Sequence, residues 1–160
     1  MKFTVWIEQS VVDEMVDEAA KEPKLEIGGV LMGYWANDTA VITRIVGPGP
    51  AAVRKRRRFQ PDSKWQSQEI ARIYQESGRT VTYLGDWHSH PKLPPMPSLL
   101  DVTTARKIAQ AEESRTPKPL MLILGEDPVS KAPLLAAYRY DRKHLNACKV
   151  IVYDGTPPEA

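Results

Sequence analysis

Short stretches in which alternate residues are apolar recur along the chain, a pattern typical of β-strands with one face on a core. At the N-terminus, Phe3, Val5 and Ile7 alternate with Thr4 and Trp6. The same criteria predict strands at residues 26–35, 40–46, 81–87, 120–124, 134–140 and 147–153. Because residues 120–124 are apolar at every position, we expect both faces of that strand to be covered.

Helical spacing of apolar residues separates these strands at three places. We expect a first helix that Ser10 caps and Pro23 ends, a second over residues 63–77, and a third over residues 99–114. The residues expected to face the core are Val12, Met15, Val16 and Ala19 in the first helix, Trp65, Ile70, Ile73 and Tyr74 in the second, and Leu100, Ala105 and Ile108 in the third.

The order of these elements predicts the fold class. Strands and helices alternate without a strict βαβ rhythm, and residues 26–35 and 40–46 form one clear hairpin around the turn Asn37-Asp38. This order favours an α/β protein with a mixed sheet and helices on both faces.

The most informative segment runs from Gly85 to Asp101, where a strand, a proline-rich loop and a helix start follow one another. His88 and His90 are two residues apart at a strand end, so their side chains should share a face. Ser98 is expected to cap the third helix, and Asp101 lies in its first turn, where the helix N-terminus keeps a carboxylate ionised.

These residue types in this arrangement suit a metal ion. Two neutral imidazoles and one carboxylate leave the fourth position of a zinc ion open for water, as in catalytic rather than structural zinc sites. A simpler interpretation is also open, because a strand-end histidine is often a polar loop residue and Ser98-x-x-Asp101 is a variant capping box that needs no metal. The joint occurrence of all four residues favours the metal site.

The spacing H-x-H, seven residues, S-x-x-D resembles the signature of the JAMM metalloisopeptidases, also called the MPN or JAB-domain family. His88, His90, Ser98 and Asp101 match it without a gap, and Glu26 in the segment E-I-G-G-V-L-M-G matches the upstream glutamate. The likeness extends over roughly residues 3–140. Without the histidines, Glu26 would be interpreted as a solvated carboxylate at the start of a strand.

The resemblance implies a fold, a cofactor and roles for five residues. The fold would be the cytidine-deaminase-like three-layer α-β-α form of the α/β class. One Zn²⁺ per chain, with a catalytic water, would be bound by His88, His90 and Asp101. Glu26 would be the general base, and Ser98 would stabilise negative charge on the substrate carbonyl oxygen.

The family cleaves peptide or isopeptide bonds after the tail of a ubiquitin-like protein. The chain is most similar to short stand-alone bacterial deconjugating peptidases that accompany E1-like and E2-like enzymes in antiphage (antiviral defence) conjugation systems. These resemblances imply that a ubiquitin-like protein or its conjugates, and those E1-like and E2-like enzymes, are partners. Trp35, Trp65 and Trp87 could line a substrate groove or belong to the core.

Three other functions are alternatives to deconjugation. A peptidase acting on the tail of a sulfur-carrier protein would have the same motif. A non-catalytic MPN scaffold is disfavoured because such relatives lack the ligands that this chain retains. A zinc deaminase on a related fold needs H-x-E with P-C-x-x-C, which a chain with one cysteine cannot supply.

Length and composition predict the number of domains and the cellular compartment. At 160 residues, with 42% hydrophobic and 26% charged residues, the chain is expected to form one domain over 1–160, with 154–160 as a flexible tail. The single cysteine, Cys148, excludes an internal disulfide and fits a reducing compartment. Neither a signal-peptide core nor a membrane-length apolar run is present, so we expect a cytoplasmic protein without membrane contact.

One charged run stands out. The formal net charge is +2, and Arg54 to Arg58 alone contribute five positive charges, so the positive charge is local. The run could be a solvated edge strand on which cations discourage pairing, or it could steer an acidic partner. Nucleic acid binding is not expected, because no aromatic residues are interleaved with these cations.

Overall fold

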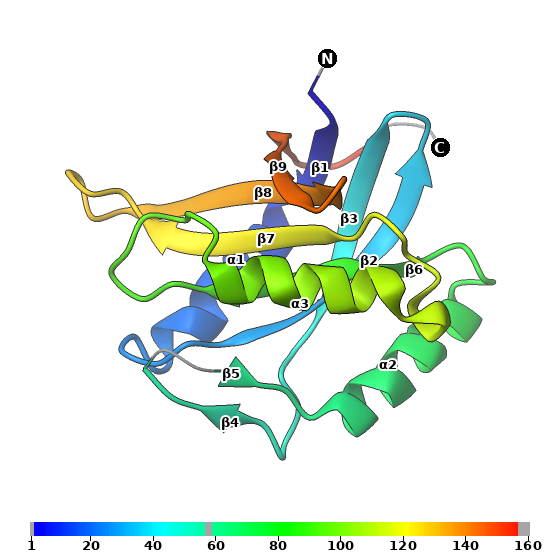
Figure 1. Cartoon of the computed structure of the whole chain (residues 1–160), viewed down its shortest axis with the longest axis horizontal. Helices are drawn as coiled ribbons and strands as arrows, with labels where there is room; N and C mark the ends of the chain where they lie inside the picture. Colours follow the sequence, from blue (N-terminus) through cyan, green and yellow to red (C-terminus); the bar gives the residue numbers. More distant parts are fainter. Residues whose placement is uncertain (1, 57–58, 157–160) are drawn as a thin grey trace.

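A mixed sheet of eight strands forms the centre of the computed structural model, which describes residues 2–56 and 59–156 (Figure 1). Its strand order is β10-β1-β3-β2-β6-β7-β8-β9. The strands are β1 (Thr4–Glu8), β2 (Gly28–Ala36), β3 (Thr39–Val46), β6 (Thr82–Ser89), β7 (Leu120–Glu126), β8 (Pro133–Asp141), β9 (His144–Ala147) and β10 (Lys149–Tyr153). A separate two-stranded sheet pairs β4 (Val53–Arg54) with β5 (Phe59–Gln60).

Parallel and antiparallel pairs both occur, as expected for the mixed sheet. Strand β1 runs parallel to β3 and β10, and β6 runs parallel to β7. The β2–β3 hairpin and the β2–β6, β7–β8 and β8–β9 pairs are antiparallel. Strand β6 therefore lies in the middle of the sheet, between β2 and β7.

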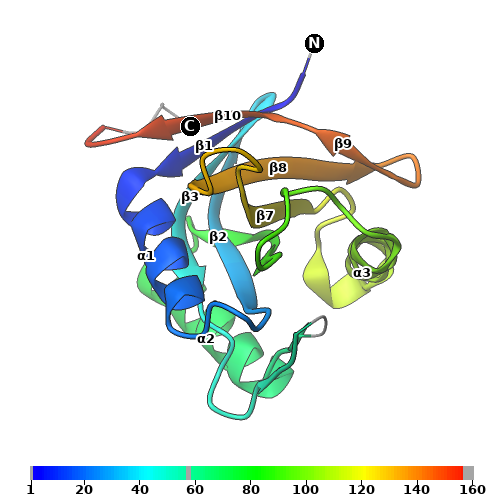
Figure 2. The ribbon, with the colours of Figure 1, turned by 90° about the vertical axis from the view of Figure 1, so that its left-hand side faces the viewer.

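The last expected strand, 147–153, is β10 over residues 149–153, whereas Ala147 ends β9, which lies at the opposite end of the strand order. Cys148 separates them, and its N–H donates to the carbonyl of Ala137 on β8. The next N–H, of Lys149, donates instead to Phe3 beside β1. Consecutive residues thus pair with both ends of the sheet, which curls so that β9 and β10 follow one another along one side (Figure 2).

Three α-helices cover the two faces of the sheet: α1 (Gln9–Ala20), α2 (Ser63–Glu76) and α3 (Leu99–Gln110). Strand β7 shows how the faces divide. Leu120, Leu122 and Leu124 join the cluster that contains α1, whereas Met121 and Ile123 pack with α3. Figure 2 shows α1 and α3 on opposite sides of the strands. The expected three-layer α-β-α arrangement is confirmed.

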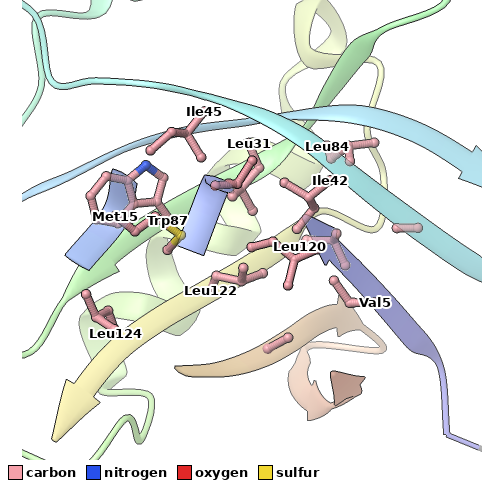
Figure 3. Packing of buried hydrophobic residues seen from close by; sticks show 14 of the residues in the cluster. Val5, Met15, Leu31, Ile42, Ile45, Leu84, Trp87, Leu120, Leu122 and Leu124 are labelled. Carbon is pink, nitrogen blue, oxygen red and sulfur yellow. The ribbon is translucent and has the colours of Figure 1, made fainter. Parts of the chain in front are cut away.

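The main core lies between α1 and the sheet (Figure 3). Met15 of α1 is fully buried there with Leu31, Ile42 and Leu122 from three strands. Trp87 of β6 belongs to the same cluster with 1% of its surface exposed. Trp87 is therefore a core residue, and its burial holds the middle of β6 against α1.

Three expectations about the helices are wrong. Ser10 does not cap α1, because β1 runs directly into the helix and Glu8 takes the N-cap position without a side-chain cap. Leu100 does not face the core but is 61% exposed beside the metal centre described below. The third helix also ends at Gln110, and a separate 3₁₀ turn follows at Glu112–Ser114.

The second helix agrees with its prediction. Asp62 accepts a hydrogen bond from the N–H of Trp65 at 3.2 Å and so caps α2. Ile73 is buried against β2 and β3, with Trp65 and Ile70 packed beside it. Gly78, just past the end of the helix, has a φ of +69°, a backbone conformation that glycine adopts readily.

No helix among residues 2–56 and 59–156 is long and apolar enough to span a membrane. Arg57 and Arg58 of the basic run, and residues 157–160 of the expected tail, lie outside the described residues.

Candidate metal centre

Two histidine side chains meet at the end of β6. His88 lies within the strand and His90 one residue beyond it, and their Nε2 atoms are 3.0 Å apart. The N–H of His90 donates to the carbonyl of Leu124, which extends the pairing with β7 past the last residue of β6. Ser89, between them, is buried on the opposite side. The expectation that the two imidazoles share a face is confirmed.

Asp101, in the first turn of α3, completes the cluster. Its Oδ1 lies 2.9 Å from Nε2 of His88, and its Oδ2 lies 3.3 Å from Nε2 of His90. The three donor atoms lie within 4.8 Å of one another. Asp101 is only 7% exposed, so its carboxylate is directed at the histidines and away from solvent.

The capping box that the sequence offered as an alternative is present as well. The Ser98 hydroxyl accepts from the N–H of Asp101 at 3.2 Å, and the N–H of Ser98 donates to Oδ2 of Asp101 at 2.7 Å. The cap and the histidine cluster therefore use the same carboxylate at once. The cap fixes where the carboxylate stands, which is what a preorganised ligand requires.

Asp101 and His90 each stabilise the charged form of the other. Burial acts to raise the pKa of Asp101, but hydrogen bonds from His88, His90 and the Ser98 N–H hold it well below its usual range. The hydrogen bond to Asp101 raises the pKa of His90, against the effect of burial. Asp101 is consequently ionised at any physiological pH.

Glu26 lies just before β2, at the edge of the same cluster. It and three residues of the centre, His90, Ser98 and Asp101, line one cavity of about 670 Å³. Burial raises the pKa of Glu26, while the nearby histidines lower it and Asp101 raises it further. A carboxyl group with a raised pKa beside a metal site is suited to accepting and returning a proton near neutral pH.

The backbone around Glu26 is fixed from both sides. Its N–H donates to the carbonyl of Lys55, next to β4. Its neighbour Ile27 is bound to Ser89 by two hydrogen bonds, from the Ile27 N–H to the serine hydroxyl and from the Ser89 N–H to the Ile27 carbonyl. Glu26 is therefore positioned, through its neighbour Ile27, by the residue that separates the two histidines.

Gly28 and Gly29 let β2 approach its neighbours closely. A Cβ on Gly28 would lie 2.4 Å from the carbonyl oxygen of Trp87, and one on Gly29 would lie 1.9 Å from that of Val46. The strand irregularities occur farther along, between Leu31 and Gly33. The paired glycines thus allow the Glu26 end of β2 to lie against β6.

Two residues of this region escaped the sequence analysis. The Ser89 hydroxyl was missed because its partner, Ile27, is 62 residues away in the chain. Asp86 lines a smaller cavity of about 220 Å³ with His88, and its carboxylate accepts from the Tyr83 hydroxyl at 2.7 Å. Burial raises the pKa of Asp86 to about 6, against the opposing effects of Tyr83 and His88. Strand alternation alone predicts neither the hydrogen bond between Ile27 and Ser89 nor the burial of the Asp86 carboxylate.

The donor set fits a metal ion. Two imidazole nitrogens and one carboxylate oxygen are a common triad for a divalent metal with an open position. Within the described part of the chain, this is the one group of three or more such residues close enough to bind an ion together.

The sequence is also similar to those of known proteins. The family model of prokaryotic homologues of the JAB domain matches residues 8–140. A probable metalloprotease, y4qB, of Sinorhizobium fredii is 42% identical over 83% of this chain and 82% of its own. A CD-NTase/cGAS isopeptidase of Enterobacter hormaechei is 30% identical over 84% of this chain and 74% of its own.

The fold also occurs in a solved structure of distant sequence. Protein DSY2949 of Desulfitobacterium hafniense superposes with a TM-score of 0.73 at 20% identity, over 94% of both chains. That likeness shows the fold alone. The evidence for the chemistry is the sequence matches and the histidine–aspartate cluster. The chain therefore belongs to the prokaryotic JAB-domain (JAMM/MPN) family and is a metallopeptidase.

Proposed function

We propose that the chain is a zinc-dependent peptidase that cleaves after the C-terminal tail of a ubiquitin-like protein, or of another protein conjugated through its tail. The observation that carries this proposal is the convergence of His88, His90 and Asp101 within 4.8 Å, beside a cavity that Glu26 and Ser98 also line. The spacing of the sequence motif and the cavity that Glu26, His90, Ser98 and Asp101 line together support this proposal.

Zinc is the metal that best fits the proposed ligands His88, His90 and Asp101. It accepts imidazole nitrogen and carboxylate oxygen together, and three protein ligands leave room for one water. A bound zinc ion would supply a polarised water whose pKa falls toward about 7.

Glu26 is the proposed general base. Its raised pKa allows it to take a proton from the attacking water and to hand that proton to the departing amine. The hydrogen bonds of Glu26 to Lys55 and of Ile27 to Ser89 keep its backbone still during this transfer.

Ser98 is the proposed donor to the substrate carbonyl oxygen. Its hydroxyl oxygen accepts from the N–H of Asp101, and this uses a lone pair and leaves the hydroxyl proton free to donate. Negative charge grows on the carbonyl oxygen as water attacks, and one such donor stabilises it by about 2.7 to 4 kcal/mol. Capping the helix and assisting the reaction are therefore compatible.

The choice of substrate rests on the relatives. The isopeptidase name of the Enterobacter relative supports a conjugated protein as substrate. A role in antiphage defence, with E1-like and E2-like enzymes as partners, is the part of the proposal that rests on the family resemblance of the sequence. An extended tail could bind by main-chain pairing beside the sheet, with its scissile bond at the metal centre. A scaffold without activity is disfavoured, because this chain retains the complete donor set together with Glu26.

Metal content and cleavage test the proposal together. We expect about one zinc ion per purified chain by elemental mass spectrometry, and its loss in His90→Ala. The zinc-loaded chain should release a reporter protein whose lysine is joined to the C-terminus of ubiquitin or of a CD-NTase, and His90→Ala should not. Zinc bound without cleavage of either conjugate would contradict the proposed substrate class, and a folded chain that binds no zinc would contradict the metal centre.

A further inference from the structure

Three cations surround the cavity beside the metal centre: Lys24, Arg56 and Lys92. They come from three separate segments, namely the connection from α1 to β2, the β4–β5 hairpin and the loop after β6. All three side chains are exposed. None of them forms an ion pair with another described residue. We call these three residues the basic rim.

The basic run found in the sequence contributes to this rim through its place in the fold. Glu26 donates its N–H to the carbonyl of Lys55, and Arg54 Nε lies 3.4 Å from the carbonyl oxygen of Glu26. These contacts hold the β4–β5 hairpin against the segment that leads into β2 (Figure 1). The described residues of the run, 54–56, therefore lie beside the proposed general base, which a merely solvated edge would not require.

The rim carries positive charge that the site does not neutralise. The cavity contains two carboxylates, Glu26 and Asp101, and a divalent ion at the metal centre would offset both of them. The three rim charges would then remain, at the walls of a cavity where low-dielectric surroundings strengthen their field. The cavity is also partly apolar, because Leu93 and Leu100 line it and are 58% and 61% exposed.

We propose that the basic rim is a subsite for acidic side chains, so that the enzyme prefers a substrate tail with Asp or Glu beside the scissile bond. Aliphatic substrate residues would cover Leu93 and Leu100 in the same cavity. This inference rests on the proposed function and adds to it the charge of the segment that the enzyme selects.

An acidic polypeptide fits the cavity better than a nucleic acid does. Single-stranded nucleic acids combine backbone charge with bases that stack on aromatic side chains. The described residues that line this cavity include no Phe, Tyr or Trp, and their one aromatic ring is the imidazole of the proposed metal ligand His90. Carboxylates on a flexible peptide need only the charges of the rim, and the exposed leucines suit peptide side chains.

Three dye-labelled peptides of equal length test the preference. Each has a central Leu-Gly-Gly, flanked on both sides by Asp and Glu, by Asn and Gln, or by Lys and Arg. Fluorescence anisotropy with the zinc-loaded chain at low salt should show the acidic peptide binding about tenfold more tightly than the neutral one. The advantage should vanish in about 0.5 M NaCl, where charges are screened within a few ångströms.

Charge reversal tests the residues themselves. The double variant Lys24→Glu, Lys92→Glu should lose the acidic preference and bind the Lys and Arg peptide best. Lys149→Glu is the matched control, because this exposed lysine lies on β10 and does not line the cavity. It should leave all three affinities unchanged.

The possible outcomes separate this inference from the proposed function. Mass spectrometry of the same mixtures records cleavage independently of binding. An acidic preference without cleavage supports the subsite and counts only against peptidase activity on these tails. Cleavage without a charge preference overturns the subsite, as does equal or undetectable binding of the three peptides. A single-stranded oligonucleotide that displaces the acidic peptide at lower concentration than unlabelled acidic peptide would also overturn it.

Discussion

Ile27 and Ser89 are bound to each other twice: the Ile27 N–H donates to the Ser89 hydroxyl at 3.0 Å, and the Ser89 N–H donates to the Ile27 carbonyl at 2.7 Å. Ile27 directly follows the proposed base Glu26, and Ser89 separates the two histidines of the metal centre. This pair therefore links the backbone next to the proposed general base to the backbone between the proposed metal ligands.

Replacing Ser89 with alanine should loosen that connection. The Ile27 N–H is in a buried segment and would lose its acceptor, which costs about 1–3 kcal/mol of unfolding free energy. Cleavage should fall more than zinc content, because Glu26 shifts while the metal ligands remain. Urea unfolding, elemental analysis and cleavage rates measure the three effects. Ser67→Ala, at an exposed position of α2, is the control and should alter none of them.

Glu26→Gln tests the proposed proton transfer with little change of shape. The amide cannot accept the proton, so cleavage should fall by about 10²–10⁴-fold while zinc content and stability stay near those of the wild type. Glu22→Gln, an exposed neighbour in the same connection, should retain full activity. If Glu26→Gln released the metal, Glu26 would have to be a ligand and the assignment as general base would be wrong.

Two substitutions at Asp101 separate its role in the helix cap from its role at the metal. Asparagine keeps an oxygen that can accept the Ser98 N–H, so Asp101→Asn should be nearly as stable as the wild type but bind zinc at least about tenfold more weakly. Asp101→Ala should lose a further ~1 kcal/mol of stability, because the cap is lost as well. Equal zinc affinity in all three proteins would leave Asp101 as a cap alone.

Most of the metal centre could be predicted because its parts are close in sequence. His88 and His90 needed only strand alternation, and Ser98 and Asp101 needed only the spacing of a helix start. Glu26 needed the family resemblance, since 62 residues separate it from His88 and its place depends on the pairing of β2 with β6. Periodicity holds no information about such pairing.

The fold shows the same division between local and distant effects. The expected range 63–77 agrees closely with α2, because the cap at Asp62 and the turn at Gly78 act within a few residues. Ser10 was wrongly predicted to cap the first helix, because β1 continues into α1 without a loop. Leu100 was wrongly predicted to be buried, because its spacing fits an apolar stripe although its side chain lines the cavity. The separation of β9 from β10 at Cys148 arises because Cys148 and Lys149 pair with strands near opposite ends of the curled sheet, and no local sequence pattern predicts such pairing.

The metal-free chain should have an unusual pH dependence. The pKa of His90 is raised above its ordinary 6.5, so its stabilising contact is complete below about pH 6.5 and is lost as the pH rises through the higher folded value. The pKa of Asp101 is lowered, so its contribution is present above about pH 4 and is lost only as the pH falls through the folded value. The contributions of His90 and Asp101 to the stability of the metal-free protein are therefore both complete between about pH 4 and 6.5.

Zinc should reverse this dependence, because metal and protons compete for the imidazoles. Thermal unfolding with a chelator should give a lower Tm at about pH 8.5 than at about pH 5.5, whereas the Tm increase caused by zinc should grow over the same range. Asp101→Asn should flatten the metal-free slope, since it removes the charge that raises the pKa of His90. A metal-free Tm that rises steadily toward pH 8.5 would contradict the coupling of these two residues.

Gly29 tests whether close strand approach holds the site together. An added methyl would lie 1.9 Å from the Val46 carbonyl oxygen and 2.8 Å from the Trp87 indole nitrogen, and neither backbone nor core can yield easily. Gly29→Ala should therefore cost about 1–3 kcal/mol or more and displace the Glu26 end of β2 from its place between β3 and β6. Gly47→Ala is the matched control, because nothing lies within 4 Å of its added methyl. Urea unfolding should show little change in Gly47→Ala, and equal losses in both variants would mean that glycine flexibility, and not strand contact, governs this region.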